Sequence, residues 1–288
     1  MIIKYFGLIE FIVYGLGSLM GLILFFANKK KILSYLNTLL SSKKNGIKTR
    51  EYFSINPFTP SPKKWEISYK DGIIDGMRTQ WHKNGQKQQE SNFKDGKEDG
   101  MLTQWYQNGK KMVDGNYFNG KLSGKYTLWF DDGQKEAECN FTDGKRDGKQ
   151  TQWYVNGQKS LEVPFKDDKE DGMKTTWYEN GHKKSEGDIK DDKEDGMWTL
   201  WYKNGQKEQE CNFKDGKEDG MLTQWNKNGH KQQESNFKDG KQDGMSTQWH
   251  ENGKKRSECN FKDDKEDGML TRWDENGQKQ LERNYKKK

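Results

Sequence analysis

The chain has 288 residues, of which only 30% are apolar and 33% are charged. A chain of this length would normally form two domains, but so few apolar side chains cannot fill two ordinary cores, which excludes a plain two-domain enzyme. Aromatic residues make up 13% of the chain and include 11 Trp, far more than disordered segments carry, so the fold must order these rings.

The formal net charge of +6 comes entirely from the N-terminal part of the chain. Residues 1–64 hold ten Lys or Arg and two acidic residues, a balance of +8. The remaining 224 residues carry 41 basic and 43 acidic residues, a balance of −2. Because the body of the protein is nearly neutral, we expect no nucleic-acid partner.

An apolar segment opens the chain. Residues 5–27 contain one charged residue, Glu10, and at about 1.5 Å per helical residue they are long enough to cross a bilayer core of about 30 Å. We predict a single-pass transmembrane anchor at residues 1–28. A cleaved signal peptide and a buried core helix are the alternatives, but the basic region before the segment is only Lys4 and the cleavage site is poor.

Lysine clusters follow this segment and predict that the C-terminal body faces the cytoplasm. Residues 29–44 have apolar side chains at helical spacing, which predicts a basic amphipathic helix beside the membrane, or a continuation of the membrane helix into water. The candidate contacts to anionic lipid are Lys29, Lys30, Lys31, Lys43 and Lys44. Residues 45–64 contain three of the four prolines and are predicted to be a linker.

A repeat of 24 residues fills residues 65–288. Nine tryptophans recur at this interval, and each is followed four residues later by Gly, preceded by Asn in all repeats but one. A period in this range indicates a repeat architecture, and Asn-Gly between two short runs indicates a β-hairpin. The nine residues are Trp81, Trp105, Trp129, Trp153, Trp177, Trp201, Trp225, Trp249 and Trp273.

The loop length sets which side chains share a face. A three-residue loop ending in a left-handed Gly pairs each Trp with the residue six later. It is predicted to place Trp on one apolar face with the residue twelve later, which is Phe, Tyr or, in one repeat, Ile189. In the third repeat this face would hold Thr127, Trp129, Ala137, Cys139 and Phe141. An acidic residue nine after each Trp would then lie on the opposite, polar face, either solvated or as a docking face for a basic partner.

Short polar turns such as Lys214 to Gly220 join each hairpin to the next, so antiparallel pairing is predicted to continue from repeat to repeat. The expected fold is all-β, an elongated single-layer antiparallel meander of about eighteen strands. Cys139, Cys211 and Cys259 lie two or three repeats apart, too far for disulfides, and are predicted to be small core residues. Asp168, Asp192 and Asp264 replace a turn Gly, and their turns are expected to be slightly strained.

This unit resembles the variant MORN repeat. Phe93–Gly100 followed by Trp105–Gly109 shows the full pattern, in which an aromatic residue and Lys-Asp-Gly-Lys-x-Asp-Gly precede a strand with two aromatics and Asn-Gly. The resemblance covers residues 65–288 and implies a non-catalytic scaffold for protein or membrane association. Bacterial chains with this variant look like the YwqK-type antitoxins, which makes a toxin one possible partner.

The sequence therefore predicts a membrane-anchored, non-catalytic scaffold that binds an unidentified protein, with no cofactor, metal, catalytic residue or small-molecule substrate. The alternative is a structural spacer or a membrane-surface element that contacts anionic lipid. The candidate interaction face consists of Trp105, Trp129, Trp153, Trp177, Trp201, Trp225 and Trp249.

Overall fold

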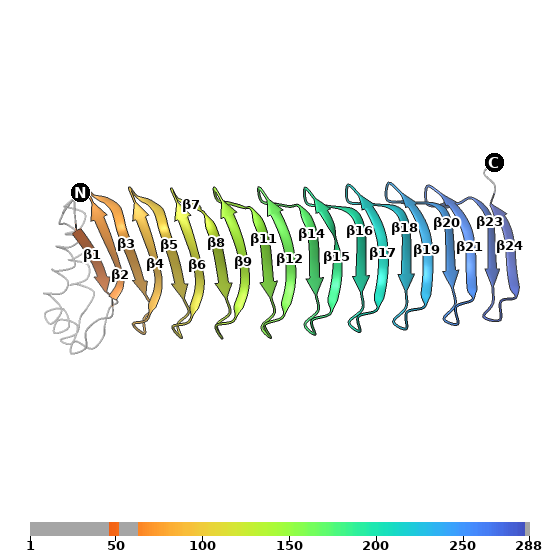
Figure 1. Ribbon diagram of the computed structural model, residues 1–288, viewed down its shortest axis with the longest axis horizontal. Coiled ribbons are helices and arrows are strands. Elements are labelled where there is room, and N and C mark those ends of the chain that lie inside the picture. The colour runs from red at the N-terminus through yellow and green to blue at the C-terminus, as the bar shows by residue number, and fades with distance from the viewer. Residues whose placement is uncertain (1–45, 52–62, 286–288) are drawn as a thin grey trace, which may run out of the picture. The chain divides into compact units, whose positions relative to one another are not determined.

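The computed structural model describes residues 46–51 and 63–285, and all the regular structure in them is β-strand (Figure 1). The predicted transmembrane anchor at residues 1–28 and the predicted helix at residues 29–44 lie outside these ranges, as do Lys29, Lys30, Lys31, Lys43 and Lys44. Within the described ranges, no helix has the length and apolar character needed to span a bilayer.

The chain divides into two compact units, residues 1–121 and 122–288. The strands of the first unit are β1 (Gly46–Glu51), β2 (Lys63–Lys70), β3 (Ile73–Trp81), β4 (Lys87–Lys94), β5 (Lys97–Trp105) and β6 (Lys111–Phe118). The short strand β7 (Lys121–Leu122) lies at the boundary. The second unit opens with β8 (Gly124–Trp129), β9 (Lys135–Thr142), β10 (Lys145–Arg146), β11 (Gly148–Trp153), β12 (Lys159–Lys166), β13 (Lys169–Glu170), β14 (Gly172–Trp177) and β15 (Lys183–Lys190). It continues with β16 (Lys193–Trp201), β17 (Lys207–Lys214), β18 (Lys217–Trp225), β19 (Lys231–Lys238), β20 (Lys241–Trp249), β21 (Lys255–Lys262), β22 (Lys265–Glu266), β23 (Gly268–Trp273) and β24 (Lys279–Tyr285).

Within each unit the strands follow one another in sequence order, and successive strands pair antiparallel (Figure 1). The exceptions are the two parts of a divided strand, such as β10 and β11, which both pair with β9. This confirms the predicted meander for each unit. Each repeat contributes one hairpin, and in several repeats the first strand is divided in two. In the second unit the division falls six residues before the Trp, at Asp147, Asp171 and Asp267.

The Asn-Gly turns have the predicted three-residue loop. In the hairpin of β16 and β17, Trp201 pairs with Lys207, and the Tyr202 amide donates to the carbonyl oxygen of Gln206 at 2.9 Å. The loop residues between them end in Gly205, whose φ of +86° is the left-handed conformation that favours glycine. The hairpins are joined by tight two-residue turns such as Asp215-Gly216, where both φ angles are positive.

The prediction of one shared apolar face is wrong. The pairing shifts by one residue immediately before each Trp, so that in the third repeat Thr127 pairs with Glu138 while Tyr126 pairs with Cys139. Directly paired residues lie on the same side of an antiparallel sheet, and side chains alternate along a strand. Thr127 and Trp129 therefore lie on the face of the acidic residue, and Ala137, Cys139 and Phe141 lie on the opposite face.

We call the first of these surfaces the Trp face. It carries Trp, the residues two and four before it, and the residues six and nine after it. The other surface is the core face, which carries the residues one and three before Trp and those eight, ten and twelve after it. Most of the buried apolar residues occupy these core-face positions, and Val163 and Cys211 are 0% exposed. In the second unit the buried apolar core-face residues are Cys139, Val163, Phe165, Ile189, Trp198, Cys211, Leu222, Cys259 and Leu270.

The predicted linker at residues 45–64 also needs correction. Residues Gly46–Glu51 form β1, which pairs antiparallel with β2, and β2 begins at Lys63, before the predicted start of the repeats. Lys48 places its ammonium 4.4 Å from the ring centroid of Tyr69 on β2, so this strand also makes a side-chain contact with its neighbour.

Candidate interaction face

The seven tryptophans of the candidate face end the first strand of their hairpins, and each is half-buried. Trp105 belongs to the first unit, and the other six belong to the second. Residues at equivalent positions of successive hairpins are two strands apart, about 9.6 Å at ~4.8 Å per strand. The tryptophans of one unit therefore form a row and do not stack directly on one another.

A lysine from the preceding hairpin lies over most of these rings. Lys159 places Nζ 5.7 Å from the ring centroid of Trp177, and the same Nζ is 2.6 Å from a carboxylate oxygen of Glu162. The ammonium group is thus shared between a carboxylate and an aromatic ring. The same arrangement places Lys87 over Trp105, Lys135 over Trp153, Lys183 over Trp201 and Lys207 over Trp225.

The acidic residues lie on this face and not on a separate polar one. Each pairs with a Thr two residues before the Trp, and that Thr is buried in most repeats; Thr175, at 7% exposure, donates its hydroxyl to Glu186 at 3.2 Å. Lysine six after the Trp completes the cluster, as in the 2.5 Å pair of Lys255 and Glu258. Each of these carboxylates therefore has a lysine partner within the protein, whereas the sequence predicted them on a polar face open to solvent or to a basic partner.

Methionine is the exposed apolar residue of the Trp face. It occurs four residues before the Trp in five consecutive hairpins of the second unit, where exposure ranges from 41% to 53%. We call these five residues the methionine row: Met173, Met197, Met221, Met245 and Met269. This Met lies two residues before the Thr that the single-face prediction grouped with the apolar residues, so the same prediction would bury Met and misses its exposure.

Two hairpins of the second unit have Lys in place of this Met. Lys125 Nζ lies 2.6 Å from Oε1 of Glu138, whose other oxygen is 2.7 Å from Lys135. Lys149 bridges to Glu162 in the same way. Burial acts to raise the pKa of Glu138 and of Glu162, but the two ammonium groups beside each carboxylate outweigh it, so both pKa values are lowered. A long side chain four residues before the Trp, at the position that Met occupies in the other hairpins, can therefore reach the acidic residue.

In several hairpins, side chains of the Asn-Gly turn bond to the next repeat of the same unit. Tyr202 donates its hydroxyl to the carbonyl oxygen of Trp225 at 2.8 Å, and Asn204 donates Nδ2 to that of Lys227 at 3.0 Å. His82 and His250 occupy the position of Tyr202, and each ring bonds to the carbonyl oxygen of the next Trp. His82 and His250 therefore link one hairpin to the next, as Tyr202 does.

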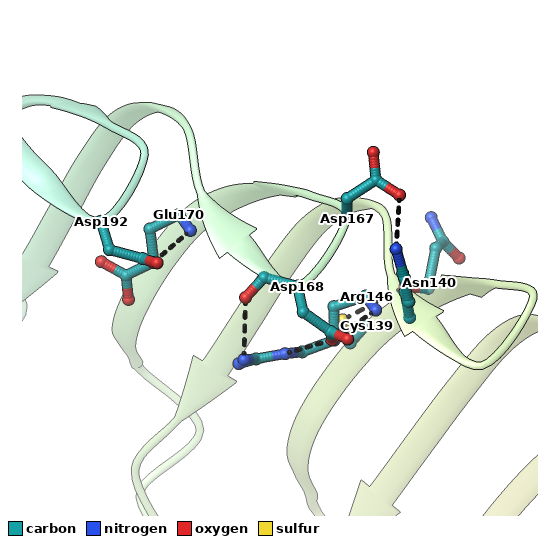
Figure 2. Close-up of polar contacts among 8 residues, drawn as sticks. Cys139, Asn140, Arg146, Asp167, Asp168, Glu170 and Asp192 are labelled. Carbon is teal, nitrogen blue, oxygen red and sulfur yellow. Dashed lines mark hydrogen bonds and ion pairs between the residues drawn. The ribbon is translucent and has the colours of Figure 1, made fainter.

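The turns with Asp in place of Gly contain a compensating contact (Figure 2). Asp168 has a φ of 72°, and its amide donates to the carbonyl oxygen of Arg146 at 2.9 Å, as the Gly amide does in other turns. Its carboxylate also accepts the Arg146 amide at 2.8 Å, and this bond lowers the pKa of Asp168. Asp192 and Asp264 accept backbone amides in the same manner. The side chain thus adds a hydrogen bond that Gly cannot make.

The three cysteines lie on the core face and are free and buried. Burial is the main cause that raises the pKa of each thiol, and the pKa of Cys211 rises to about 12, with the carboxylates of Glu218 and Glu194 adding to the effect. The thiols are therefore protonated at neutral pH and serve as small apolar groups.

Comparison with known proteins supports the assignment of the 24-residue unit as a MORN-type repeat. Four segments match the family described as MORN repeat variant: residues 74–95, 194–215, 242–263 and 266–287. No curated protein matches the chain. Each matched segment begins seven residues before one of the period-24 tryptophans, in the same phase as the hairpins of the structure. The matches support a MORN repeat protein.

Proposed function

We propose that the chain is a non-catalytic repeat scaffold that binds a protein partner through the Trp face of its second unit. The observation that carries this proposal is the methionine row, because five large apolar side chains are exposed in register on the face opposite the core. Exposed apolar side chains gathered on one face are typical of interaction sites, and Met adapts to the shape of a partner. The general use of MORN repeats in protein or membrane association supports it.

We further propose that residues 1–28 anchor the protein in a membrane with the repeats on the cytoplasmic side. The apolar sequence of this segment and the lysines after it support this topology. The resemblance to YwqK-type antitoxins makes a toxin the first class of partner to test.

Co-purification from membranes tests the binding proposal. The full chain and a variant with Met197→Lys, Met221→Lys and Met245→Lys are isolated in parallel. Lys is already accepted at this position in two other hairpins, so the variant is expected to fold. A matched variant with Met→Leu at the same three positions is the control.

We expect a stoichiometric partner with the full chain and with the Leu variant, and its loss from the Lys variant. A partner retained equally by all three proteins would contradict the proposal. Liposome binding without any protein partner would instead support the spacer or lipid-associated alternative.

A further inference from the structure

The strands that carry the methionine row are interior strands of the sheet and offer no open edge to a partner strand. β14, β16, β18, β20 and β23 are each paired with strands on both sides. A partner on this face therefore meets side chains only and must satisfy its own backbone hydrogen bonds. An α-helix does so within itself, whereas an extended strand needs a sheet edge.

The spacing of the row favours a helix laid across the strands. Successive methionines are about 9.6 Å apart at two strands per repeat. Seven residues of α-helix rise about 10.5 Å, so an apolar side chain at every seventh position stays close to register over the row. The row of five methionines spans about 38 Å, which corresponds to a helix of about 26 residues.

Polyproline helices have a similar repeat of about 9.3 Å per three residues, but they dock on open aromatic surfaces. On this face the Trp rings are half-buried, and lysine ammonium groups lie over Trp153, Trp177, Trp201 and Trp225. The exposed groups are flexible methionines, which suit the apolar face of a helix better than a proline ridge.

The charges beside the row indicate which helix fits. Two hairpins have Lys in place of Met, and in each of them a second ammonium group contacts the acidic residue. Lys125 contacts Oε1 of Glu138, and Lys149 contacts Oε1 of Glu162. In hairpins with Met, Glu186, Glu210, Glu234 and Glu258 each have one lysine partner, six residues after the Trp. A basic side chain of a partner above Met221 would be within reach of the place that Lys125 and Lys149 fill in their own hairpins.

We propose that the methionine row binds a basic amphipathic α-helix, with an apolar side chain at every seventh position and Lys or Arg one helical turn from each. The apolar side chains insert between successive methionines, and the basic groups bond to the acidic residues of the Trp face. This inference rests on the proposed function and names the chemistry of its partner.

A labelled synthetic peptide of about 29 residues, with Leu at every seventh position and Lys four residues after each Leu, is the probe. Its binding to the purified full chain is measured by fluorescence anisotropy. One control peptide has the same composition with Leu at every fifth position, and a second has Pro at every third position. We expect the first peptide to bind at least about tenfold more tightly than either control, a difference of about 1.4 kcal/mol.

The protein variants locate the binding surface. The triple Met→Lys variant is expected to weaken binding of the first peptide at least about tenfold, and the triple Met→Leu variant to leave it within about twofold. Lys149→Met extends the methionine row by one hairpin, since position 149 lies one hairpin before Met173 and two before Met197. This variant is expected to bind a longer peptide more tightly. Equal binding of the three peptides, tighter binding of the proline peptide, or no effect of Met→Lys would overturn the inference.

The outcome is separable from that of the proposed function. If no peptide binds but the co-purified partner is still lost from the Met→Lys variant, the row binds a partner of another kind, so the helix inference fails and the proposed function stands. If neither depends on the row, both fail.

Discussion

The indole ring of Trp198 lies directly over the α-carbon of Gly187, its partner in the register of β15 and β16. A Cβ added to Gly187 would lie 2.3 Å from Cδ2 of this ring, closer than any real contact. Trp198 is only 8% exposed, and its Nε1 donates to the carbonyl oxygen of Asp188 at 2.9 Å. The equivalent pair between β17 and β18 joins a small residue to a medium-sized one, Cys211 and Leu222. The glycine thus makes room for an indole ring on the core face.

Gly187→Ala should therefore destabilise the protein by overpacking, by about 1–3 kcal/mol. The free energy of unfolding in urea measures the loss. The double variant Gly187→Cys with Trp198→Leu recreates the pair of Cys211 and Leu222 and should recover most of it. A Gly187→Ala protein as stable as the original would show that the indole does not occupy this position.

Gly172 offers a second test of close packing, at a position where the backbone conformation also favours glycine. Its φ is +120°, and an added Cβ would lie 2.7 Å from Cγ of Pro164. Gly124 also has a positive φ, of +78°, but an added Cβ there meets no atom within 4 Å. Gly124→Ala should therefore cost only the backbone strain, about 1–2 kcal/mol, and Gly172→Ala should cost clearly more. Thermal unfolding of the two variants side by side measures the difference, and equal losses would argue against the Pro164 contact.

The thiol of Cys211 should be protected from reaction in the folded protein. Its pKa of about 12 keeps the thiol protonated at pH 8, and the residue is 0% exposed. Modification by a thiol reagent should be slow in buffer and fast in urea. Met221→Cys places a thiol at a position that is 53% exposed in the original protein and should react rapidly in buffer. Similar rates at the two positions would contradict the assignment of the two faces.

The Asp168 turn should contribute a pH-dependent stability. Because the Arg146 amide lowers its pKa in the folded state, the carboxylate stabilises the fold at pH values above the unfolded pKa of about 3.9. That contribution is lost as the pH falls through the lower folded pKa. Asp168→Asn keeps an acceptor oxygen without the charge, so it should be less stable than the original at pH 7, and the gap should shrink below about pH 4. A gap that stays constant with pH would refute this role.

Much of the fold follows from the period of 24. The position of Gly205 four residues after Trp201 fixes the hairpin, and the three-residue loop and the pairing of Trp201 with Lys207 are as predicted. The prediction of which side chains share a face of the sheet was wrong because of one shift in strand register. The pairing of Trp with the residue six later does not extend along the strand, because the register shifts between Leu200 and Trp201. A single extra residue reverses the side on which every later partner lies.

The exposed methionines were missed in the sequence because of the same register shift. Met221 and Leu222 are adjacent in an apolar sequence, yet one is 53% exposed and the other 5%. Composition cannot distinguish them, since only the side of the sheet decides. The contrast between Met and Lys at this position, seen at Lys125 and Lys149, was the available signal, because a core position would not accept Lys so readily.

Site-specific photo-crosslinking tests the central claim most directly, that the Trp face and not the core face meets the partner. A photoreactive residue is placed at Met221 on the Trp face or at Gln224 on the core face of the same strand, in the full chain in its native membrane. We predict a discrete protein adduct from position 221 and none from position 224. An adduct from position 224 alone, or equal adducts from both positions, would contradict the account.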